Sequence, residues 1–171
     1  MLRRVFTHLH VHTLYSLLDA NIKLDELFQR VKELGQNSIA ITDHGNMYGA
    51  VEFYKTAKKH GVKPIIGCEC YICSDVTIMS KENTMYHLIL LAKNEQGRQN
   101  LQHLVKESTQ YKFNKRHRID FNMLEKYHEG LICLSACMAG EVSRALSSGS
   151  LDKAVEIATK YKNLFGEDFS R

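Results

Sequence analysis

Several features typical of membrane and multidomain proteins are scarce in this 171-residue sequence. It has a single proline, Pro64, and ten glycines, and it shows no low-complexity segment or internal repeat. No apolar run approaches the roughly 18 residues that a membrane-spanning helix needs, and residues 1–5 lead into a histidine-rich stretch, not into an apolar signal segment. We therefore expect one compact cytoplasmic domain, without flexible linkers and without a membrane partner.

A disulfide framework and a strong charge of one sign are also missing. The five cysteines form an odd set without regular spacing, which favours reduced thiols over disulfides. A formal net charge of +4 permits a polyanionic partner but falls short of the basic stripe of a dedicated nucleic-acid module. With 44% hydrophobic and 25% charged residues, the composition is that of a soluble globular protein.

Strand-like and helix-like periodicities alternate along the chain. Strands are predicted at residues 5–12, 38–42, 64–72, 86–92 and 131–135, and helices at residues 24–34, 50–60, 101–105, 142–146 and 154–164. In the second helix the expected apolar stripe is Ala50, Val51, Tyr54 and Ala57. Repeated strand and helix predict parallel pairing with right-handed crossovers, hence an α/β fold with barrel or open-sheet closure.

Three histidines at every second position, His8, His10 and His12, leave the same face of the first predicted strand. Several imidazoles on one side of a strand are costly to bury unless something binds them. We therefore predict His10 and His12 as metal ligands. His8 either supports a ligand without binding metal itself or has no role at the site.

Further candidate ligands follow the later strands. Glu69 lies inside an apolar strand, where an unpaired carboxylate would destabilise the fold, and a cation is the simplest partner. The position of His87 near the start of its strand is awkward for a parallel barrel, so an irregular or antiparallel connection is expected there. The other candidates end strands or lie in nearby loops: Asp19, His44 and Cys137.

Imidazole and carboxylate ligands with one thiolate suit Zn²⁺, Mn²⁺ or Fe²⁺ better than Ca²⁺. Six or seven ligands exceed the needs of one tetrahedral ion, so two or three ions bridged by Glu69 or Asp19 are expected. Neighbouring ions of this kind generate a hydroxide nucleophile and clamp phosphate oxygens.

These residues resemble the PHP (polymerase and histidinol phosphatase) family. Its motifs are matched in order by His10-x-His12, Ser16-x-x-Asp19, Thr42-Asp43-His44-Gly45, Gly67-x-Glu69, His87 and Cys137. The longer stretches at residues 6–13, 15–19, 40–45, 63–69 and 130–137 resemble in particular the amino-terminal region of bacterial DNA polymerase III alpha subunits. The resemblance covers nearly the whole chain.

The resemblance implies a distorted seven-stranded TIM-like β/α barrel over residues 1–171, with a trinuclear metal site and 3′–5′ exonuclease chemistry. It implies seven ligands, His10, His12, Asp19, His44, Glu69, His87 and Cys137, of which we predict His12, His44 and Glu69 as catalytic. DNA and other replicase subunits are the implied partners of the full-length protein. A further Asp-x-His pair of the family is absent, so we expect a fragment whose barrel is incomplete at its C-terminal side and which lacks the polymerase active site.

Two other functions stay open at this stage. One is a free-standing small-molecule phosphoesterase such as histidinol phosphatase, which shares the ligand pattern. The other is a non-catalytic structural module that holds metal or a partner surface, which the two missing ligands favour for this chain.

Two weaker signals have simpler interpretations. Residues 111–118 interleave aromatic and cationic side chains, which suits nucleic-acid contact but is more often a solvated loop. Cys68-x-Cys70-x-x-Cys73 lacks the fourth ligand of a structural zinc site, so buried inert thiols are favoured.

Overall fold

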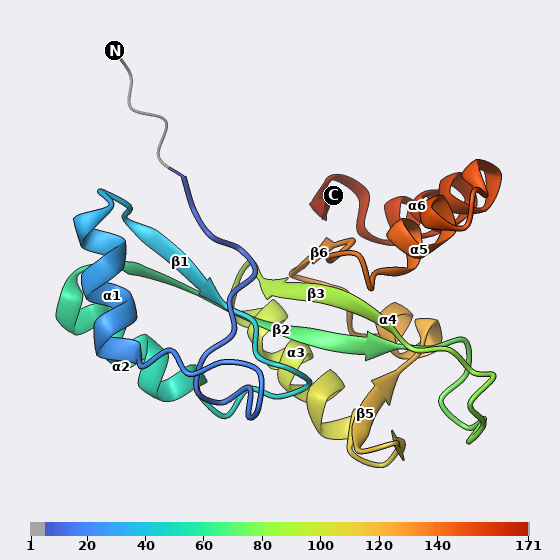
Figure 1. Ribbon diagram of the computed structural model, residues 1–171, viewed down its shortest axis with the longest axis horizontal. Coiled ribbons are helices and arrows are strands. Elements are labelled where there is room, and N and C mark those ends of the chain that lie inside the picture. Colours follow the sequence, from blue (N-terminus) through green and yellow to red (C-terminus); the bar gives the residue numbers. More distant parts are fainter. Residues whose placement is uncertain (1–5, 171) are drawn as a thin grey trace.

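The computed structural model describes residues 6–170 and places a twisted, mixed β-sheet through the middle of the molecule (Figure 1). The helices within these residues are α1 Leu24–Glu33, α2 Ala50–His60, α3 Glu95–Ser108, α4 Phe121–Tyr127, α5 Glu141–Ser147 and α6 Leu151–Phe165, with the 3₁₀ turn η1 Gly166–Asp168. The strands are β1 Ser38–Ile41, β2 Lys63–Ile72, β3 Tyr86–Ala92, β4 Lys112–Phe113, β5 Arg116–Ile119, β6 Leu131–Leu134 and β7 Phe169–Ser170. Helices α1 and α2 lie at one end of the sheet, and α5 and α6 lie at the other (Figure 1).

The sheet is ordered β4-β5-β2-β3-β6-β7, and β1 pairs with the first half of β2. Parallel pairing, which the alternation of elements predicts, is found for β1 with β2, β2 with β5 and β6 with β7. The prediction of parallel pairing is wrong for β3, which runs antiparallel to both β2 and β6. The antiparallel connection anticipated from His87 is confirmed, because this register sets His87 opposite Tyr71 at the end of β2.

The predicted first strand is only partly present. Val5 lies outside the described residues, and the chain that follows is extended beside β1 without forming a regular strand. The amide of Ala40 donates to the carbonyl of His8, and the amide of Thr42 donates to the carbonyl of Val11, each at 2.9 Å. These bonds fix the path of the chain toward the carboxyl end of β1.

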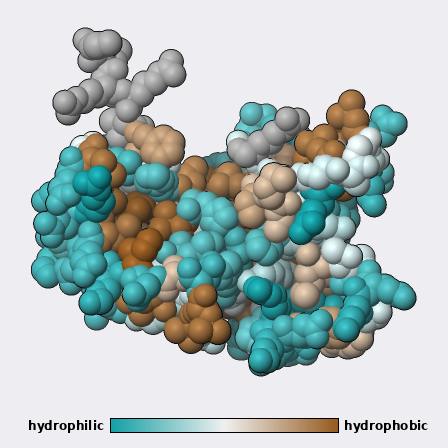
Figure 2. All heavy atoms as spheres, in the orientation of Figure 1, coloured by the Kyte–Doolittle hydropathy of each residue, from teal (hydrophilic) through white to brown (hydrophobic). Residues whose placement is uncertain are grey.

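Apolar side chains form two main cores, one between α1, α2 and β1 and a larger one between the sheet and α3 to α6. In α2 the buried residues are Phe53 and Ala57, whereas Val51 and Tyr54 are exposed, so the predicted stripe is partly wrong. The buried face of α2 is thus offset from the predicted one, and Phe53 packs against Phe28 of α1 with the ring centres 4.9 Å apart. The face in Figure 2 is mostly hydrophilic, with separate brown patches.

Residues 111–119 form a feature that the sequence did not reveal. They make a short hairpin of β4 and β5, which joins the sheet beside the end of β2, so the segment is not a loop throughout, although its turn at residues 114–116 is exposed as expected. Helix α4, capped by Asp120, was also not predicted. It has only seven residues, of which Met123 and Leu124 are buried, and so short a helix shows little apolar periodicity in the sequence.

The cysteine interpretation is confirmed for the described residues. All five cysteines are free, and Cys68, Cys70 and Cys73 are buried in the core. None of the helices in residues 6–170 is long and apolar enough to cross a membrane.

Candidate metal centre

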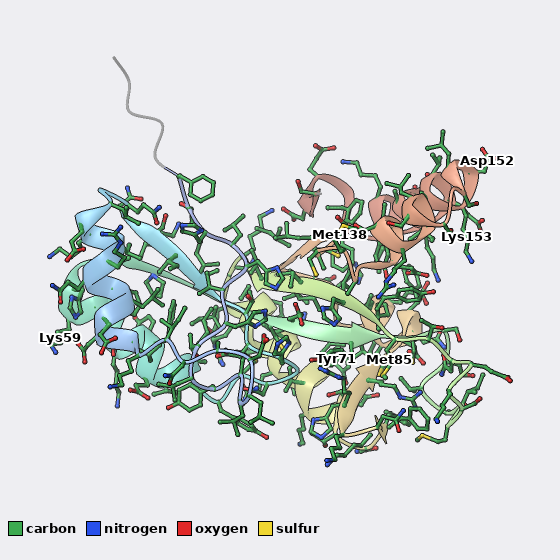
Figure 3. All side chains as sticks on the ribbon, in the orientation of Figure 1. Lys59, Tyr71, Met85, Met138, Asp152 and Lys153 are labelled. Atoms are coloured by element: carbon green, nitrogen blue, oxygen red, sulfur yellow. The ribbon has the colours of Figure 1, made fainter. Side chains whose placement is uncertain are left out.

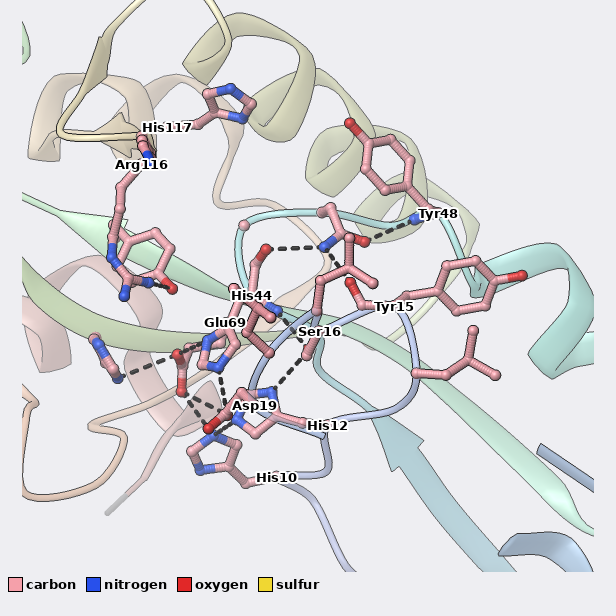
Figure 4. A pocket seen from close by; sticks show the side chains of 18 of the residues that line it. His10, His12, Tyr15, Ser16, Asp19, His44, Tyr48, Glu69, Arg116 and His117 are labelled. Atoms are coloured by element: carbon pink, nitrogen blue, oxygen red, sulfur yellow. Dashed lines mark hydrogen bonds and ion pairs between the residues drawn. The ribbon is translucent and has the colours of Figure 1, made fainter. Parts of the chain in front are cut away.

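One open cavity of about 1050 Å³ lies at the ends of β1 and β2, and all seven predicted ligands line it. They come from five stretches of the chain that are far apart in sequence. Figure 4 shows Glu69 and His44 at the centre of the group, with His10, His12 and Asp19 beside them. The metal hypothesis requires that these groups lie close together, and they do.

Glu69 is the hub of the cluster. Its side chain is only 1% exposed, and its two oxygens lie 2.7 Å from His10 Nε2, 3.6 Å from His12 Nε2, 2.6 Å from His44 Nδ1 and 3.1 Å from His87 Nδ1. Burial alone would raise the pKa of this carboxyl, but hydrogen bonds with the four imidazoles outweigh burial and hold the pKa far below its usual range. Glu69 is thus a buried anion surrounded by nitrogen donors.

The backbone after β1 brings His44 to Glu69. The chain continues alongside β2, where the amide of Glu69 donates to the carbonyl of Asp43 and the amide of Gly45 donates to that of Glu69. Gly45 then turns the chain with a φ of +60°, a conformation that favours glycine. His44 is thereby fixed directly over the β2 carboxylate.

His44 also contacts Asp19, whose Oδ2 lies 2.7 Å from Nε2. The hydrogen bond to Glu69 raises the pKa of His44, opposed by burial and supported by Asp19. The hydrogen bond from His44 in turn lowers the pKa of Asp19. Both ring nitrogens of His44 therefore face carboxylates, an arrangement that favours the charged imidazole or a cation bound between these groups.

Two sets of donor atoms fit a small cation. In each set the atoms lie within 4.8 Å of one another: His10, His12 and Glu69 form the first set, and His12, Asp19 and His44 form the second. Nε2 of His10 faces Nε2 of His12 at 3.1 Å, and two imidazole lone pairs at this distance need a proton or a cation between them. The donor set of imidazoles and carboxylates therefore fits transition-metal ions such as Zn²⁺.

The remaining two candidates lie at the rim. His87 reaches Glu69 directly, and the exposed thiol of Cys137 lies 3.9 Å from Nδ1 of His87. His8 does not line the cavity; its exposed ring packs edge-on against Phe6 at 4.8 Å. The structure thus separates His8 from the other two histidines, because His8 lies beside Ile39 of β1, before the chain reaches the end of the sheet.

Comparison with known proteins agrees with this geometry. The PHP domain family matches residues 8–170. The chain belongs to the PHP family.

Relatives of this PHP domain are DNA polymerase III alpha subunits. That of Borreliella burgdorferi is 46% identical over 171 residues, which cover 98% of this chain and 15% of the relative. That of Helicobacter pylori is 44% identical over 177 residues, with 97% and 15% covered. The chain therefore spans about one seventh of the length of these relatives.

Among solved structures, a protein of Bifidobacterium adolescentis, named as a candidate metal-dependent phosphoesterase, aligns with a TM-score of 0.43 at 14% identity. The alignment covers 96% of this PHP domain and 58% of that chain. The family assignment rests on the sequence matches.

Sequence reasoning missed the role of Asp43. This buried carboxylate accepts hydrogen bonds from the amide of Thr13 at 2.6 Å, the hydroxyl of Thr13 at 2.8 Å and the hydroxyl of Ser16 at 2.6 Å. Ser16 Oγ in turn lies 3.3 Å from Nδ1 of His12 and accepts from the amide of His44. Asp43 thereby orients two candidate ligands, and only its place in the Thr42-Asp43-His44-Gly45 motif hinted at this.

We expect Asp43→Asn to lower the free energy of unfolding by about 1–2 kcal/mol, since an amide weakens hydrogen bonds now made to a buried charge. Metal affinity should fall as well, because the loop that holds His12 loosens. Urea unfolding measures the first effect, with exposed Asp152→Asn as the control that should change stability little. Equal unfolding midpoints for both variants would argue against a role of Asp43 in holding the loop.

Proposed function

We propose that this chain is the amino-terminal PHP domain of a bacterial DNA polymerase III alpha subunit, with a site that cleaves phosphodiester bonds at the 3′ end of a DNA strand. The observation that supports this most strongly is Glu69, a buried carboxylate within 3.6 Å of imidazoles from three other stretches of the chain. Such a site is costly as structural packing, because a buried carboxylate is stable only with a charged partner or a bound ion.

Two or three divalent ions, Zn²⁺, Mn²⁺ or Fe²⁺, are proposed to bind here. Bound ions of this kind lower the pKa of a coordinated water and stabilise charge on phosphate oxygens. His10, His12 and Glu69 would hold one ion, and Asp19 and His44 a second, because a His12 nitrogen has one lone pair and binds a single ion. His87 and Cys137 line the same cavity at its rim and are proposed ligands for a third.

The protein side chains have separable tasks in this proposal. Glu69 would hold the cations and neutralise their charge, and we assign catalytic roles to it and to His12 and His44, which lie 3.6 Å and 2.6 Å from its oxygens. Asp19 is exposed and reaches His44 from a loop, so it closes the cluster from the solvent side. DNA polymerisation, contacts with other replicase subunits and a cytoplasmic location belong to the full-length protein and are proposed for it only.

The test combines elemental analysis with hydrolysis by the whole chain. We expect the purified chain to bind divalent metal and, with Mn²⁺ or Zn²⁺, to shorten a 5′-labelled single-stranded DNA from its 3′ end. Chelation with EDTA should abolish the cleavage. Turnover of histidinol phosphate without DNA cleavage would favour the small-molecule phosphatase, and bound metal without any hydrolysis would favour the structural module.

A further inference from the structure

The β4–β5 hairpin forms one wall of the same cavity. Its residues Asn114, Lys115, Arg116 and His117 line the cavity that contains Glu69. Figure 4 shows Arg116 and His117 on the wall above the histidine cluster. Cations from a segment remote from the ligands thus border the metal centre.

The turn of this hairpin is strained in a way that points to a function for its lysine. Asn114 and Lys115 form a two-residue turn with φ angles of 47° and 65°. Turns of this type favour Asn followed by Gly, because a side chain at positive φ is strained. A lysine at the glycine position carries a conformational cost, and strain of this kind gathers at functional sites.

A buried arginine holds the hairpin in place. Arg118 has no exposed surface, and its guanidinium donates to the carbonyls of Val76 at 2.8 Å, Ile78 at 3.0 Å and Tyr111 at 3.3 Å. The base of the hairpin is therefore fixed to the loop after β2. Lys115 and Arg116 at the tip project from a rigid support.

Arg116 is positioned close to the metal centre. Its guanidinium carbon lies 4.4 Å from the ring centre of Tyr71, and the Tyr71 ring stacks on that of His44 at 6.2 Å. Arg116 is exposed, and within residues 6–170 neither Arg116 nor Lys115 forms an ion pair with a carboxylate. Arg116 donates one hydrogen bond to the hydroxyl of Tyr71, and its other guanidinium N–H groups and the Lys115 ammonium are available to an anionic ligand.

Apolar side chains line the same cavity away from the hairpin. Leu17, Leu18 and Tyr48 are largely exposed, and they belong to two loops beside the ligands. Figure 4 places Tyr48 and Tyr15 on the side of the pocket away from His10. Cations on one wall and aromatic or apolar side chains on another are the combination that binds single-stranded nucleic acid.

We propose that Lys115 and Arg116 bind backbone phosphates of a single DNA strand, adjacent to the phosphate that lies in the metal centre. The site thereby selects a phosphodiester chain over a phosphomonoester. This inference rests on the proposed function, because it assumes that a strand end enters the cavity. Tyr48 and the two leucines then contact the bases. A phosphomonoester has no second phosphate and gains nothing from the hairpin.

The first test measures DNA binding without metal. We expect the double variant Lys115→Gln/Arg116→Gln, in EDTA, to bind a fluorescent 12-nucleotide single strand about tenfold or more weakly than the parent chain. The slope of log affinity against log salt should shrink by about 1.4, or about 0.7 for each phosphate that is no longer neutralised. The matched control is Arg144→Gln/Lys153→Gln, two exposed cations without ion pairs in the described residues, which lowers the net charge equally. Figure 3 shows Lys153 on the helices at one end of the molecule, away from Tyr71.

A second variant removes one charge while relieving strain. Lys115→Gly should bind the strand several-fold more weakly, yet its melting temperature should be equal to or above that of the parent, because glycine accepts a φ of 65°. Loss of binding in this variant cannot be explained by unfolding. Bound metal, measured by elemental analysis, should match the parent in all of these variants.

The outcomes separate the two proposals. Equal DNA affinity of the hairpin double variant and the control, or no measurable affinity of the parent chain, would overturn the hairpin proposal whatever the metal content. Absence of metal from the parent chain would overturn the proposed centre and, with it, the selection of a strand end. Weakened DNA binding with unchanged metal content supports both.

Discussion

Glu69→Gln is expected to lower metal affinity by about 100-fold or more. Substitutions of groups that merely support ligands commonly cost 10–100-fold, and Glu69 itself lies within 3.6 Å of four imidazoles. The amide keeps the size of the side chain but removes the negative charge that would join two cations. Elemental analysis after dialysis against a metal buffer measures the change.

A matched control is Glu156→Gln, which makes the same chemical change at an exposed position of α6. Its metal content should equal that of the parent chain. If Glu69→Gln also retained the full metal content, the bridging role of this carboxylate would be refuted, and with it the central step of the proposed function.

Gly97→Ala should destabilise the fold by about 3 kcal/mol or more, although alanine is otherwise the better helix former. Gly97 lies in the first turn of α3, and a Cβ built there would lie 1.7 Å from the carbonyl oxygen of Gly130. That oxygen also accepts the hydrogen bond from Lys93, so it cannot move without breaking the turn before β6. Helix and turn must separate to admit one methyl group.

Urea unfolding of Gly97→Ala measures this effect. Gln99→Ala, on the exposed face of the same helix, is the control and should change the free energy of unfolding by no more than about 0.5 kcal/mol. An unfolding midpoint for Gly97→Ala close to that of the control would mean that the α3 contact is loose in solution.

Much of the site could be predicted because its chemistry is local in sequence. His10 and His12 reveal themselves by a spacing of two, and Glu69 by standing alone in an apolar strand. These are patterns that core packing does not produce. The bounds of β2 and β3 were similarly accessible, since both strands are mainly apolar, whereas α3 extends over Glu95–Ser108, well beyond the predicted residues 101–105.

Other parts of the site depend on contacts between distant residues and left little trace in the sequence. In the sequence, Asp43 is an ordinary polar residue at the end of a strand. Only the structure shows that Thr13 and Ser16 donate hydrogen bonds to it. The hairpin at residues 112–119 resembles a solvated loop, because half of its side chains are charged and its strands are very short. Only pairing of β5 with the end of β2 brings it to the cavity.

The sequence by itself determined the alternation of strands and helices, the family, and which side chains could bind a cation, because these depend on residue type and short spacings. Tertiary structure alone decided that β3 runs antiparallel, which sets His87 beside Tyr71. It also decided that His8 is left outside the cavity and that Arg116 lies over its wall. Strand order and direction depend on the total burial of two faces of a sheet, a sum over residues far apart in the chain, which no local pattern encodes.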